Sequence, residues 1–327
     1  MAHQATAPAG GGVRLPVLAP MLATPAPGPP TAPGWAFEVK WDGVRALAYL
    51  DGTGALRLHA RSGIEITTRY PELAGLPGHL PAGTDAIFDG EITALGHDGR
   101  PDFRRLQDRM HLTAPYAITA AAERVPVTLI LFDLLWHRER SLVALPYTQR
   151  RDLLDGLAIA GEHVRTPPMW RDAGDLAMDW TRQLRLEGIV AKRLASPYRP
   201  GRRTPEWIKV RHTEDIDVVI GGWVPSEADP EAVASVLIGV PEKEGSRLRY
   251  VGHVGTGLTQ RERRWLAREL REVAADASPF ADNRDIPHRA TPTRWTRPVL
   301  RAQIEYLNWT PAGRLRHPVW HGLLGAE

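Results

Sequence analysis

The chain has 327 residues, 43% hydrophobic and 24% charged, which is the composition of a globular protein with a sizeable core, so disorder as the dominant state is excluded. No apolar run approaches the roughly 20 residues of a membrane helix and the amino end has no secretory signal pattern, so we expect a cytoplasmic protein with no membrane partner. The absence of cysteine excludes disulfides and thiolate chemistry, and a net charge of +3 permits a polyanionic partner without requiring one.

Residues 1–33 are rich in Pro, Ala and Gly and are predicted to form a flexible arm that ends by lying over a domain. Residues 34–212 are predicted to form a mixed α+β domain, because short β-rich runs alternate with turns and helical patterns. The predicted strands are Phe37–Val39, Val44–Leu50, Leu56–Arg61, Ala86–Leu95 and Val127–Leu135. The predicted helices are Asp102–Met110, Tyr147–Leu157 and Gly174–Arg185.

A polar break at His212–Asp215 separates this domain from a second one, residues 213–327. Its predicted elements are strands at Asp217–Trp223, Ser235–Val240 and Arg249–Val254, a helix at Thr259–Val273 and later strands near Val299–Leu307. Thr259 and Glu262 have the spacing of a capping box at the start of the helix. Several short strands with one helix favour a small β-barrel such as the OB-fold, although a sandwich would give a similar pattern. Asp215 and Asp217 are interpreted as ordinary loop charges.

The first motif that can carry chemistry is F-E-V-K-W-D-G-V-R at residues 37–45, in which Lys40 follows a predicted strand and precedes a glycine turn. A lysine can act as a covalent nucleophile when burial or nearby cations lower the pKa of its ammonium group. An arginine could not take this role, because its guanidinium group does not lose its proton in proteins. An isolated lysine of this kind is usually a solvated loop residue, so the assignment depends on the motifs that accompany it.

Lysine is rare in this chain, with only Lys40, Lys192, Lys209 and Lys243 among the 41 Lys and Arg residues. A genome rich in G and C explains the scarcity. It does not explain the positions of the lysines. Three of the four lie in this motif or in the motifs of the next paragraph, and Lys243 alone lies in a predicted ordinary loop.

Six further motifs follow Lys40: R-S-G at 61–63, F-D-G-E at 88–91, D-F-R-R-L-Q at 102–107, L-F-D-L-L at 131–135, E-G-I-V-A-K-R at 187–193 and W-I-K-V-R at 207–211. Together with K-x-D-G-x-R, this ordered series resembles the ATP-dependent DNA ligases of the covalent nucleotidyltransferase superfamily, most closely the bacterial ligases of end-joining repair. The resemblance covers essentially the whole chain after Trp35. It implies an α+β nucleotidyltransferase (adenylation) domain with mixed antiparallel sheets, followed by a small OB-fold domain.

The resemblance also implies roles for individual residues. Lys40 would take AMP from ATP, Arg61 would hold the ribose or phosphate side of the nucleotide, Phe132 would stack on adenine and Glu38 would reach the adenine amino group. The implied catalytic residues are Lys40, Asp42, Lys192 and Lys209. The implied nucleotide contacts are Glu38, Lys40, Arg45, Arg61, Glu91, Phe132, Lys192, Lys209 and Arg211. Glu91 and Glu187 would hold Mg²⁺ or Mn²⁺, Lys192 and Lys209 would stabilise charge on the phosphates, and Asp42 would orient the metal or the 3′-hydroxyl group.

The function implied by the resemblance is ATP-dependent sealing of 5′-phosphate/3′-hydroxyl breaks in duplex DNA through a lysyl-AMP intermediate, in DNA repair or end joining. The expected partners are nicked or broken duplex DNA, a Ku-type end-binding protein and a repair polymerase. The expected form is a monomer near the nucleoid. The open alternatives are an RNA ligase, a capping-type guanylyltransferase and a DNA-binding homologue with impaired adenylation.

Three departures from the family pattern qualify these expectations. Arg211 replaces the usual second lysine of its motif, and since charge is kept we expect modest effects. The carboxyl end has Leu324 where an arginine is usual and no acidic-acidic-lysine tail follows, so we expect slow self-adenylation. No separate helical DNA-binding domain precedes Trp35, so we expect a minimal two-domain ligase with a weak grip on DNA.

Overall fold

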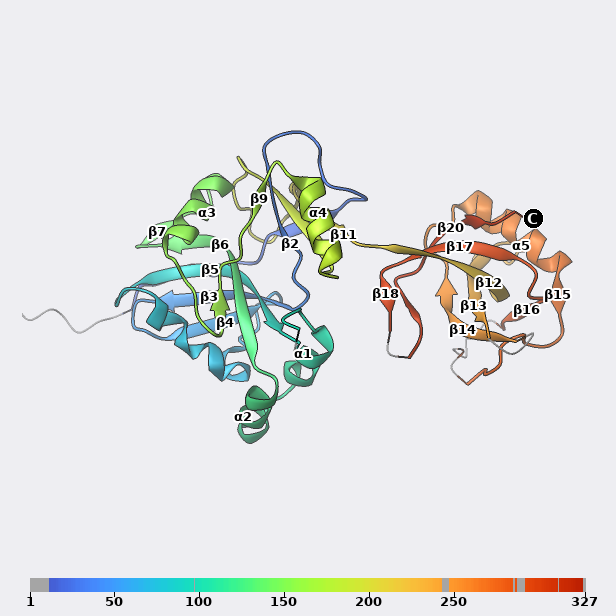
Figure 1. Cartoon of the computed structure of the whole chain (residues 1–327), viewed down its shortest axis with the longest axis horizontal. Helices are drawn as coiled ribbons and strands as arrows, with labels where there is room; N and C mark the ends of the chain where they lie inside the picture. The colour runs from blue at the N-terminus through green and yellow to red at the C-terminus, as the bar shows by residue number, and fades with distance from the viewer. Residues whose placement is uncertain are drawn as a thin grey trace, which may run out of the picture. The chain divides into compact units, whose positions relative to one another are not determined.

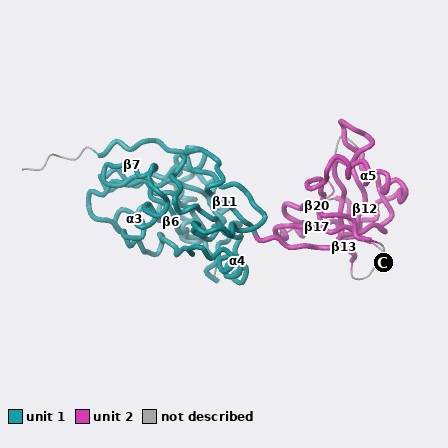
Figure 2. The backbone as a smooth tube through the Cα atoms, turned by 90° about the horizontal axis from the view of Figure 1, so that it is seen from above, with its two compact units in different colours: residues 1–211 teal, residues 212–327 magenta. Residues whose placement is uncertain are grey.

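The computed structural model of the chain describes residues 12–96, 98–242, 247–284, 286, 292–310 and 312–325. The chain divides into two compact units, residues 1–211 and residues 212–327 (Figures 1 and 2). The first eleven residues of the predicted arm and Lys243 lie outside the described residues. Within the described residues, no helix has the length and apolar character needed to cross a membrane.

Unit 1 contains a five-stranded sheet, here called the site sheet, with the strand order β1-β11-β10-β2-β9. Its strands are β1 (Leu22–Pro25), β2 (Trp35–Val39), β9 (Trp170–Arg171), β10 (Gly188–Arg193) and β11 (Arg203–Arg211). β1 runs parallel to β11, and the other neighbours are antiparallel. The sheet therefore brings strands from both ends of the unit together.

A second sheet of unit 1, here called the inner sheet, has the order β4-β3-β5-β6-β7, with β8 beside β6. Its strands are β3 (Val44–Asp51), β4 (Leu56–Ala60), β5 (Asp85–Ala94), β6 (Val127–His137), β7 (Arg140–Ser141) and β8 (Val164–Arg165). Side chains alternate between the two faces of a strand. Accordingly, Leu47 and Tyr49 pack in one core cluster with Phe132 and Trp207, whereas Ala46 and Ala48 pack in another.

Helices cover the outer faces of these two sheets. The helical segments are η1 (Thr67–Arg69), η2 (Pro71–His79), α1 (Phe103–Met110), α2 (Pro115–Arg124), α3 (Tyr147–Gly156) and α4 (Gly174–Gln183). Ala177 of α4 packs with Phe37 and Ile189 of the site sheet. Leu106 of α1 and Leu154 of α3 pack on the opposite face of the inner sheet. Unit 1 is therefore layered, with the two sheets facing each other and helices outside.

The prediction of a flexible arm through residue 33 is wrong for residues 22–25, which form β1. Backbone hydrogen bonding holds this segment, as in the 2.9 Å bond from the Leu22 amide to the Arg202 carbonyl group. The Thr24 hydroxyl donates a further bond of 2.9 Å to the Thr204 carbonyl. Met21, just before the strand, is fully buried. The composition of this segment predicted a linker, but its contacts lie about 180 residues away along the chain.

Unit 2 is an antiparallel sheet with one helix packed against it. The strands follow the order β14-β13-β12-β16-β15, and β17 joins β12 to β20. The elements are β12 (Glu214–Pro225), β13 (Val233–Pro241), β14 (Leu248–Val254), α5 (Gln260–Glu272), β15 (Ala274–Ala275), β16 (Arg294–Thr296), β17 (Arg301–Tyr306), β18 (Asn308–Trp309), β19 (Leu315–Arg316) and β20 (Val319–Leu323). The buried face of α5, with Leu266 and Leu270, packs with Trp223 in the core of this sheet. This is the OB-type arrangement, so the predicted α+β class with a small barrel is confirmed.

Two details of unit 2 test the sequence predictions. The capping box is present, with the Thr259 hydroxyl accepting from the Glu262 amide and the Glu262 carboxylate accepting from the Thr259 amide. Asp215 and Asp217 are not loop charges, because both lie in β12, where Asp215 pairs with Glu305 of β17. The strand was predicted from Asp217 onward, and its first residues were missed because their polar side chains interrupt the hydrophobic pattern.

Candidate functional site

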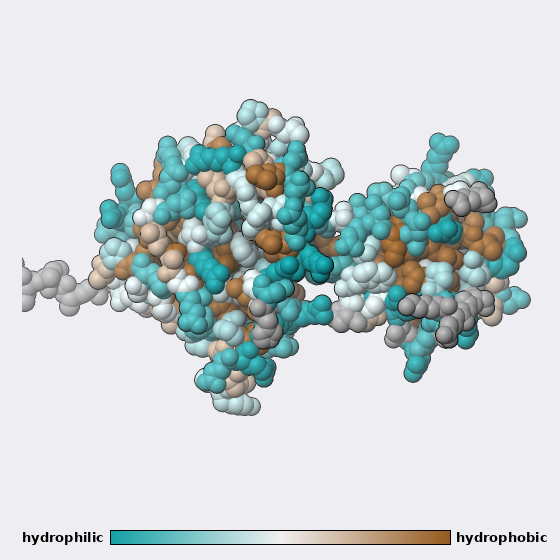
Figure 3. All heavy atoms as spheres, in the orientation of Figure 1, coloured by the Kyte–Doolittle hydropathy of each residue, from teal (hydrophilic) through white to brown (hydrophobic). Residues whose placement is uncertain are grey.

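Polar residues dominate the visible face of both units, and hydrophobic residues show in smaller patches between them (Figure 3). Unit 1 also contains a pocket of about 250 Å³, and half of the residues that line it are charged. All nine residues predicted to contact the nucleotide line it. The other lining residues are Pro20, Met21, Leu22, Ala23, Val39, Trp41, Val190, Arg203 and Trp207. Among the described lining residues, seven are cationic and two acidic, which suits a polyanionic ligand.

The register of the site sheet explains how distant motifs meet. Glu38 of β2 lies opposite Val190 of β10, which lies opposite Lys209 of β11. The next row along the same face is formed by Lys192 and Trp207. In the other direction, the Lys40 amide donates to the Gly188 carbonyl at 2.9 Å. Because same-face residues recur every second position, about 6.6 Å apart, three motifs line one wall of the pocket.

Two glycines in these motifs are required by close backbone approach. A Cβ atom at Gly43 would lie 2.2 Å from the Ile92 carbonyl oxygen, next to Glu91. A Cβ atom at Gly188 would lie 2.1 Å from the Val210 oxygen, and Gly188 also has a φ of +144°. The glycines of D-G and E-G therefore allow β3 to begin close against β5 and β10 to begin close against β11, next to Lys40 and Glu187 in sequence.

Lys40 lies in the pocket within a cluster of charged side chains. Its ammonium group is ion-paired with Glu187, and Arg211 Nε lies 2.9 Å from the other oxygen of that carboxylate. Lys209 lines the pocket nearby, and its pKa is lowered by burial and by the positive charges of Arg211, Lys40 and Arg203. A single carboxylate therefore faces several cations, an arrangement that a bound phosphate chain would balance.

Arg45 is held by a residue to which the sequence reasoning gave no role. Asp89 accepts two hydrogen bonds from it, at 2.5 Å from Nε and 2.6 Å from a terminal nitrogen. The same carboxylate accepts a 2.6 Å bond from the Tyr198 hydroxyl, which in turn accepts from the Met21 amide. Arg45 is thereby fixed with its guanidinium carbon 4.6 Å from the centre of the Phe132 ring.

Glu91 and Glu187, the predicted metal ligands, act on each other electrostatically. Burial raises the pKa of Glu91 to about 8, with Arg45 and Lys40 opposing the shift and Asp89 and Glu187 adding to it. Carboxylate oxygens are the ligands that Mg²⁺ and Mn²⁺ prefer. A divalent cation would remove the penalty for ionising Glu91, so the residues present fit such an ion.

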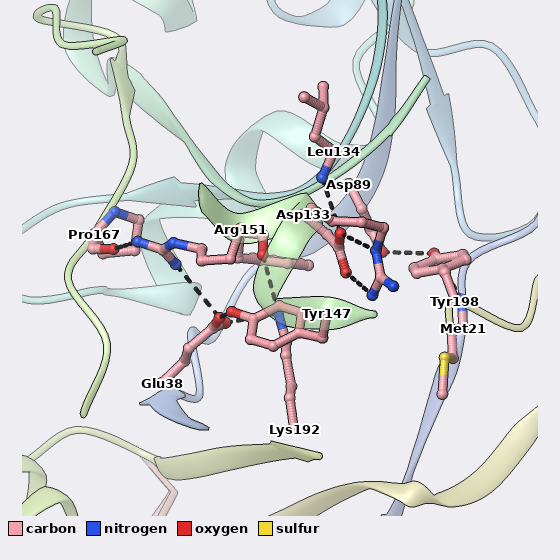
Figure 4. A network of polar contacts seen from close by, with 12 residues as sticks. Met21, Glu38, Asp89, Asp133, Leu134, Tyr147, Arg151, Pro167, Lys192 and Tyr198 are labelled. Carbon is pink, nitrogen blue, oxygen red and sulfur yellow. Dashed lines mark hydrogen bonds and ion pairs between the residues drawn. The ribbon is translucent and has the colours of Figure 1, made fainter. Parts of the chain in front are cut away.

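The structure does not place Lys192 with the Lys40–Glu187 pair, as a role at the phosphates would require. Its ammonium group lies 2.8 Å from Glu38 and donates a 3.1 Å bond to the Phe132 carbonyl, and its side chain is 1% exposed. Glu38 also accepts from the Tyr147 hydroxyl, and Arg151 lies 3.4 Å away (Figure 4). Lys192 is therefore fixed at the inner wall, two rows along the sheet from Lys40.

The remaining predicted residues differ in placement. Arg61 is exposed at the rim of the pocket, whereas Asp42 is half-buried in the turn after β2 and is not among the described residues that line the pocket. Sequence reasoning assigned no role to Arg203, Tyr147 or Arg151. Arg203 lies four residues before Trp207, and an arginine so close to a motif was a usable signal. Tyr147 and Arg151 gave no such signal, since they lie on a helix that matched no motif.

Comparison with known proteins agrees with this geometry. The family model for the ATP dependent DNA ligase domain matches residues 20–211, and the model for the ATP dependent DNA ligase C terminal region matches residues 229–324. The multifunctional non-homologous end joining DNA repair protein LigD of Mycobacterium tuberculosis is 39% identical over 315 residues, covering 94% of this chain and 38% of that protein. The chain thus spans well under half the length of that relative.

Two further proteins align over most of their own length. DNA ligase C1 of Mycolicibacterium smegmatis is 31% identical over 306 residues, covering 90% of this chain and 80% of that protein. A solved structure of mycobacterial DNA ligase D in complex with ATP and MES is 37% identical with a TM-score of 0.55, covering 95% of this chain and 96% of the other. Both family models lie in sequence order on the two units, and the chain belongs to the family of ATP-dependent DNA ligases.

Proposed function

We propose that this chain seals 5′-phosphate/3′-hydroxyl breaks in duplex DNA with ATP as the AMP donor. The observation that carries the proposal is the position of Lys40, which lines a pocket of about 250 Å³ whose cationic side chains outnumber its acidic ones. In the first step, neutral Lys40 attacks the α-phosphorus of ATP in line. The Nζ–P bond forms as the bond to pyrophosphate breaks, and the proton that the amine loses passes to water.

The pocket offers two chemically distinct ends for this step. The phosphate end consists of Lys40, Glu187, Lys209 and Arg211, whose cations would neutralise charge on the leaving pyrophosphate. The base end consists of Glu38, Lys192, Tyr147, Arg151, Phe132 and Trp207, which form a buried polar and aromatic wall. The purine would bind at the base end, and Arg61 and Glu91 would contact the sugar.

Glu91 and Glu187 would hold Mg²⁺ or Mn²⁺, which supplies charge stabilisation for phosphoryl transfer when bound. The protein residues contribute positioning. Glu187 also keeps the Lys40 ammonium group in the pocket before ATP arrives. Asp42, placed in the turn two residues after Lys40, would orient the 3′-hydroxyl group during sealing.

The later steps pass AMP from Lys40 to the DNA 5′-phosphate, after which the 3′-hydroxyl displaces AMP and joins the strand. Unit 2 would grip the duplex through backbone phosphates. Arg261, Arg264 and Arg268 are exposed on α5 and are suited to that contact.

The biological setting is proposed from the relatives. The mycobacterial LigD proteins are named for non-homologous end joining. We therefore place this chain in end joining near the nucleoid, as a monomer on DNA ends, with a Ku-type end-binding protein and a repair polymerase as its partners.

A labelling and sealing assay tests the proposal. With [α-³²P]ATP and Mg²⁺ or Mn²⁺, the chain should become labelled and should seal a 5′-phosphorylated nick in duplex DNA. Lys40→Arg should abolish both signals, because a guanidinium group cannot form the phosphoramidate. Lys243→Arg, which changes the lysine outside the motifs, is the matched control. Persistent label on Lys40→Arg would contradict the assignment.

The same assay separates the alternative functions. Preference for GTP would indicate a guanylyltransferase, and preference for nicked RNA would indicate an RNA ligase. Sealing by protein purified with AMP already attached, without turnover on added ATP, would indicate a homologue with impaired adenylation.

A further inference from the structure

A buried carboxylate at the base end of the pocket is held by three partners. Glu38 is 3% exposed, and one of its oxygens accepts from the Tyr147 hydroxyl and lies 3.4 Å from Arg151. Its other oxygen lies 2.8 Å from Lys192 (Figure 4). Burying a carboxylate is costly unless it is paired and hydrogen-bonded. These partners offset the cost of burying the Glu38 carboxylate, which still lines the pocket.

Two of the partners come from one face of α3. Tyr147 and Arg151 are four residues apart and therefore lie on the same side of the helix. Arg151 is fixed in turn, because its Nε donates to Asp155 at 2.9 Å and a terminal nitrogen donates to the Pro167 carbonyl group. Burial and the Glu38 charge raise the pKa of Tyr147 well above its usual value, so its hydroxyl group remains a donor.

Lys192 is equally fixed. Its ammonium nitrogen lies 4.5 Å from the centre of the Phe132 ring, 4.8 Å from that of Tyr147 and 4.4 Å from that of Trp207. This cage and the bond to the Phe132 carbonyl leave the ammonium group little freedom to move. The base end of the pocket therefore presents a hydrogen-bond acceptor, Glu38, beside a hydrogen-bond donor, Lys192, and both side chains are held in fixed positions.

The two purines differ in the order of the groups on their Watson–Crick edge. Adenine has a donor at N6 beside an acceptor at N1, which an adjacent carboxylate and ammonium group complement. Guanine has an acceptor at O6 beside a donor at N1, so it would face like partners unless Glu38 and Lys192 exchanged positions. Sites that hydrogen-bond a substrate group reject an analogue that leaves buried polar groups unpaired.

We propose that Tyr147 and Arg151 are positioning residues that fix Glu38 beside Lys192 and thereby make the pocket select adenine over guanine. The proposal deepens the proposed function, on which it rests for the identity of the ligand as a nucleotide. Neither residue belongs to the motifs that carry the family resemblance, and each acts through Glu38 rather than on the base.

Equilibrium binding of α,β-methylene ATP and α,β-methylene GTP tests this proposal, because neither nucleotide can release pyrophosphate. Titration calorimetry on the full chain gives the ratio of the two dissociation constants. We expect Tyr147→Phe and Arg151→Gln each to lower the preference for the adenine nucleotide by about tenfold, the effect of losing a hydrogen bond to a charged group. Arg151→Lys, which keeps the charge, should restore most of the preference.

A matched control separates positioning from a general loss of packing. Tyr70→Phe removes the hydroxyl of another buried tyrosine in unit 1, and we expect it to leave the ratio unchanged. The α,β-methylene triphosphate of purine riboside lacks the 6-amino group and completes a double-mutant cycle. Omitting that group should weaken binding to the wild type more than binding to Tyr147→Phe.

An unchanged ratio in folded Tyr147→Phe and Arg151→Gln proteins would overturn the proposal, as would an equal fall in Tyr70→Phe. If Tyr147→Phe does not fold, the Arg151→Gln and Arg151→Lys pair decides. The binding ratio does not depend on label transfer to Lys40. A chain that binds adenine selectively but takes no label would therefore contradict the sealing function and leave the positioning role standing.

Discussion

The two ends of the pocket hold their charges in different ways. At the base end, Glu38 and Lys192 are almost fully buried and each has several fixed partners. At the phosphate end, the Lys40 and Glu187 side chains are 17% and 12% exposed, and Arg211 is 37% exposed. Buried pairs cannot exchange partners without leaving a charge desolvated, whereas pairs in contact with water can. The base end therefore suits recognition of a ligand by fixed groups, and the phosphate end suits charged groups that change their ion-pair partners.

The largest expected effect comes from removing one lysine at each end. Lys192→Met should lower the free energy of unfolding by about 3 kcal/mol, because it leaves the buried Glu38 carboxylate short of a partner. Lys209→Met should change it by less than about 1 kcal/mol, because none of the buried carboxylates in the described part of the chain is ion-paired with Lys209. Urea unfolding of both variants measures the difference. Equal losses of stability would contradict the distinction between the two ends.

Next in size is the effect of Glu187→Gln, which removes a proposed metal ligand and the partner of Lys40. We expect label transfer from ATP to fall by about a hundredfold, while the preference for adenine over guanine stays as in the wild type. Initial rates with both nucleotides give the two quantities from one experiment. A change in base preference would show that the ends are coupled.

The raised pKa of Glu91 predicts a pH dependence for metal binding. Since the pKa is about 8, the carboxyl group is protonated below that pH, and a divalent cation must displace the proton. Affinity for Mn²⁺ should therefore rise about tenfold per pH unit from pH 6 to 8 and level off above. Calorimetry in buffers of different ionisation enthalpy would detect the released proton. Glu91→Gln should remove the dependence, and its persistence would exclude Glu91 as its source.

The smallest effect is expected for Arg211→Lys, which restores the residue usual in the family motif. The positive charge beside Glu187 is kept, so label transfer should change by no more than about threefold. A larger change would show that the two-nitrogen geometry of the guanidinium group matters, and it would make the phosphate end less adaptable than its exposure indicates.

The sequence predicted most elements whose pattern is local. The long apolar run of β6 and the helix predicted at Asp102–Met110, which is α1, were found because their signals lie within a few residues. α2 was missed, although Pro115 at its first position and the alanines that follow are helix signals. β1 was missed because it has no alternation, and its partner strand lies far away along the chain.

The same distinction applies to the site. All nine residues that the motifs predicted to contact a nucleotide line the pocket, since each motif is a short fixed spacing. They did not predict the location of the Lys192 ammonium group or the roles of Tyr147 and Arg151. Glu38 lies 109 residues from Tyr147 and 113 from Arg151, and only the packing of α3 on β6 brings them together. Contacts between residues so far apart along the chain form only in the assembled fold.

The parallel pairing of β1 with β11 has a consequence for how the protein is made. Pro20, Met21, Leu22 and Ala23 form part of the pocket wall, yet the strand that fixes them is the last of unit 1 to leave the ribosome. The inner sheet, whose long strands end at His137, can assemble earlier during synthesis. The pocket is therefore completed late, after the chain has been extended through residue 211.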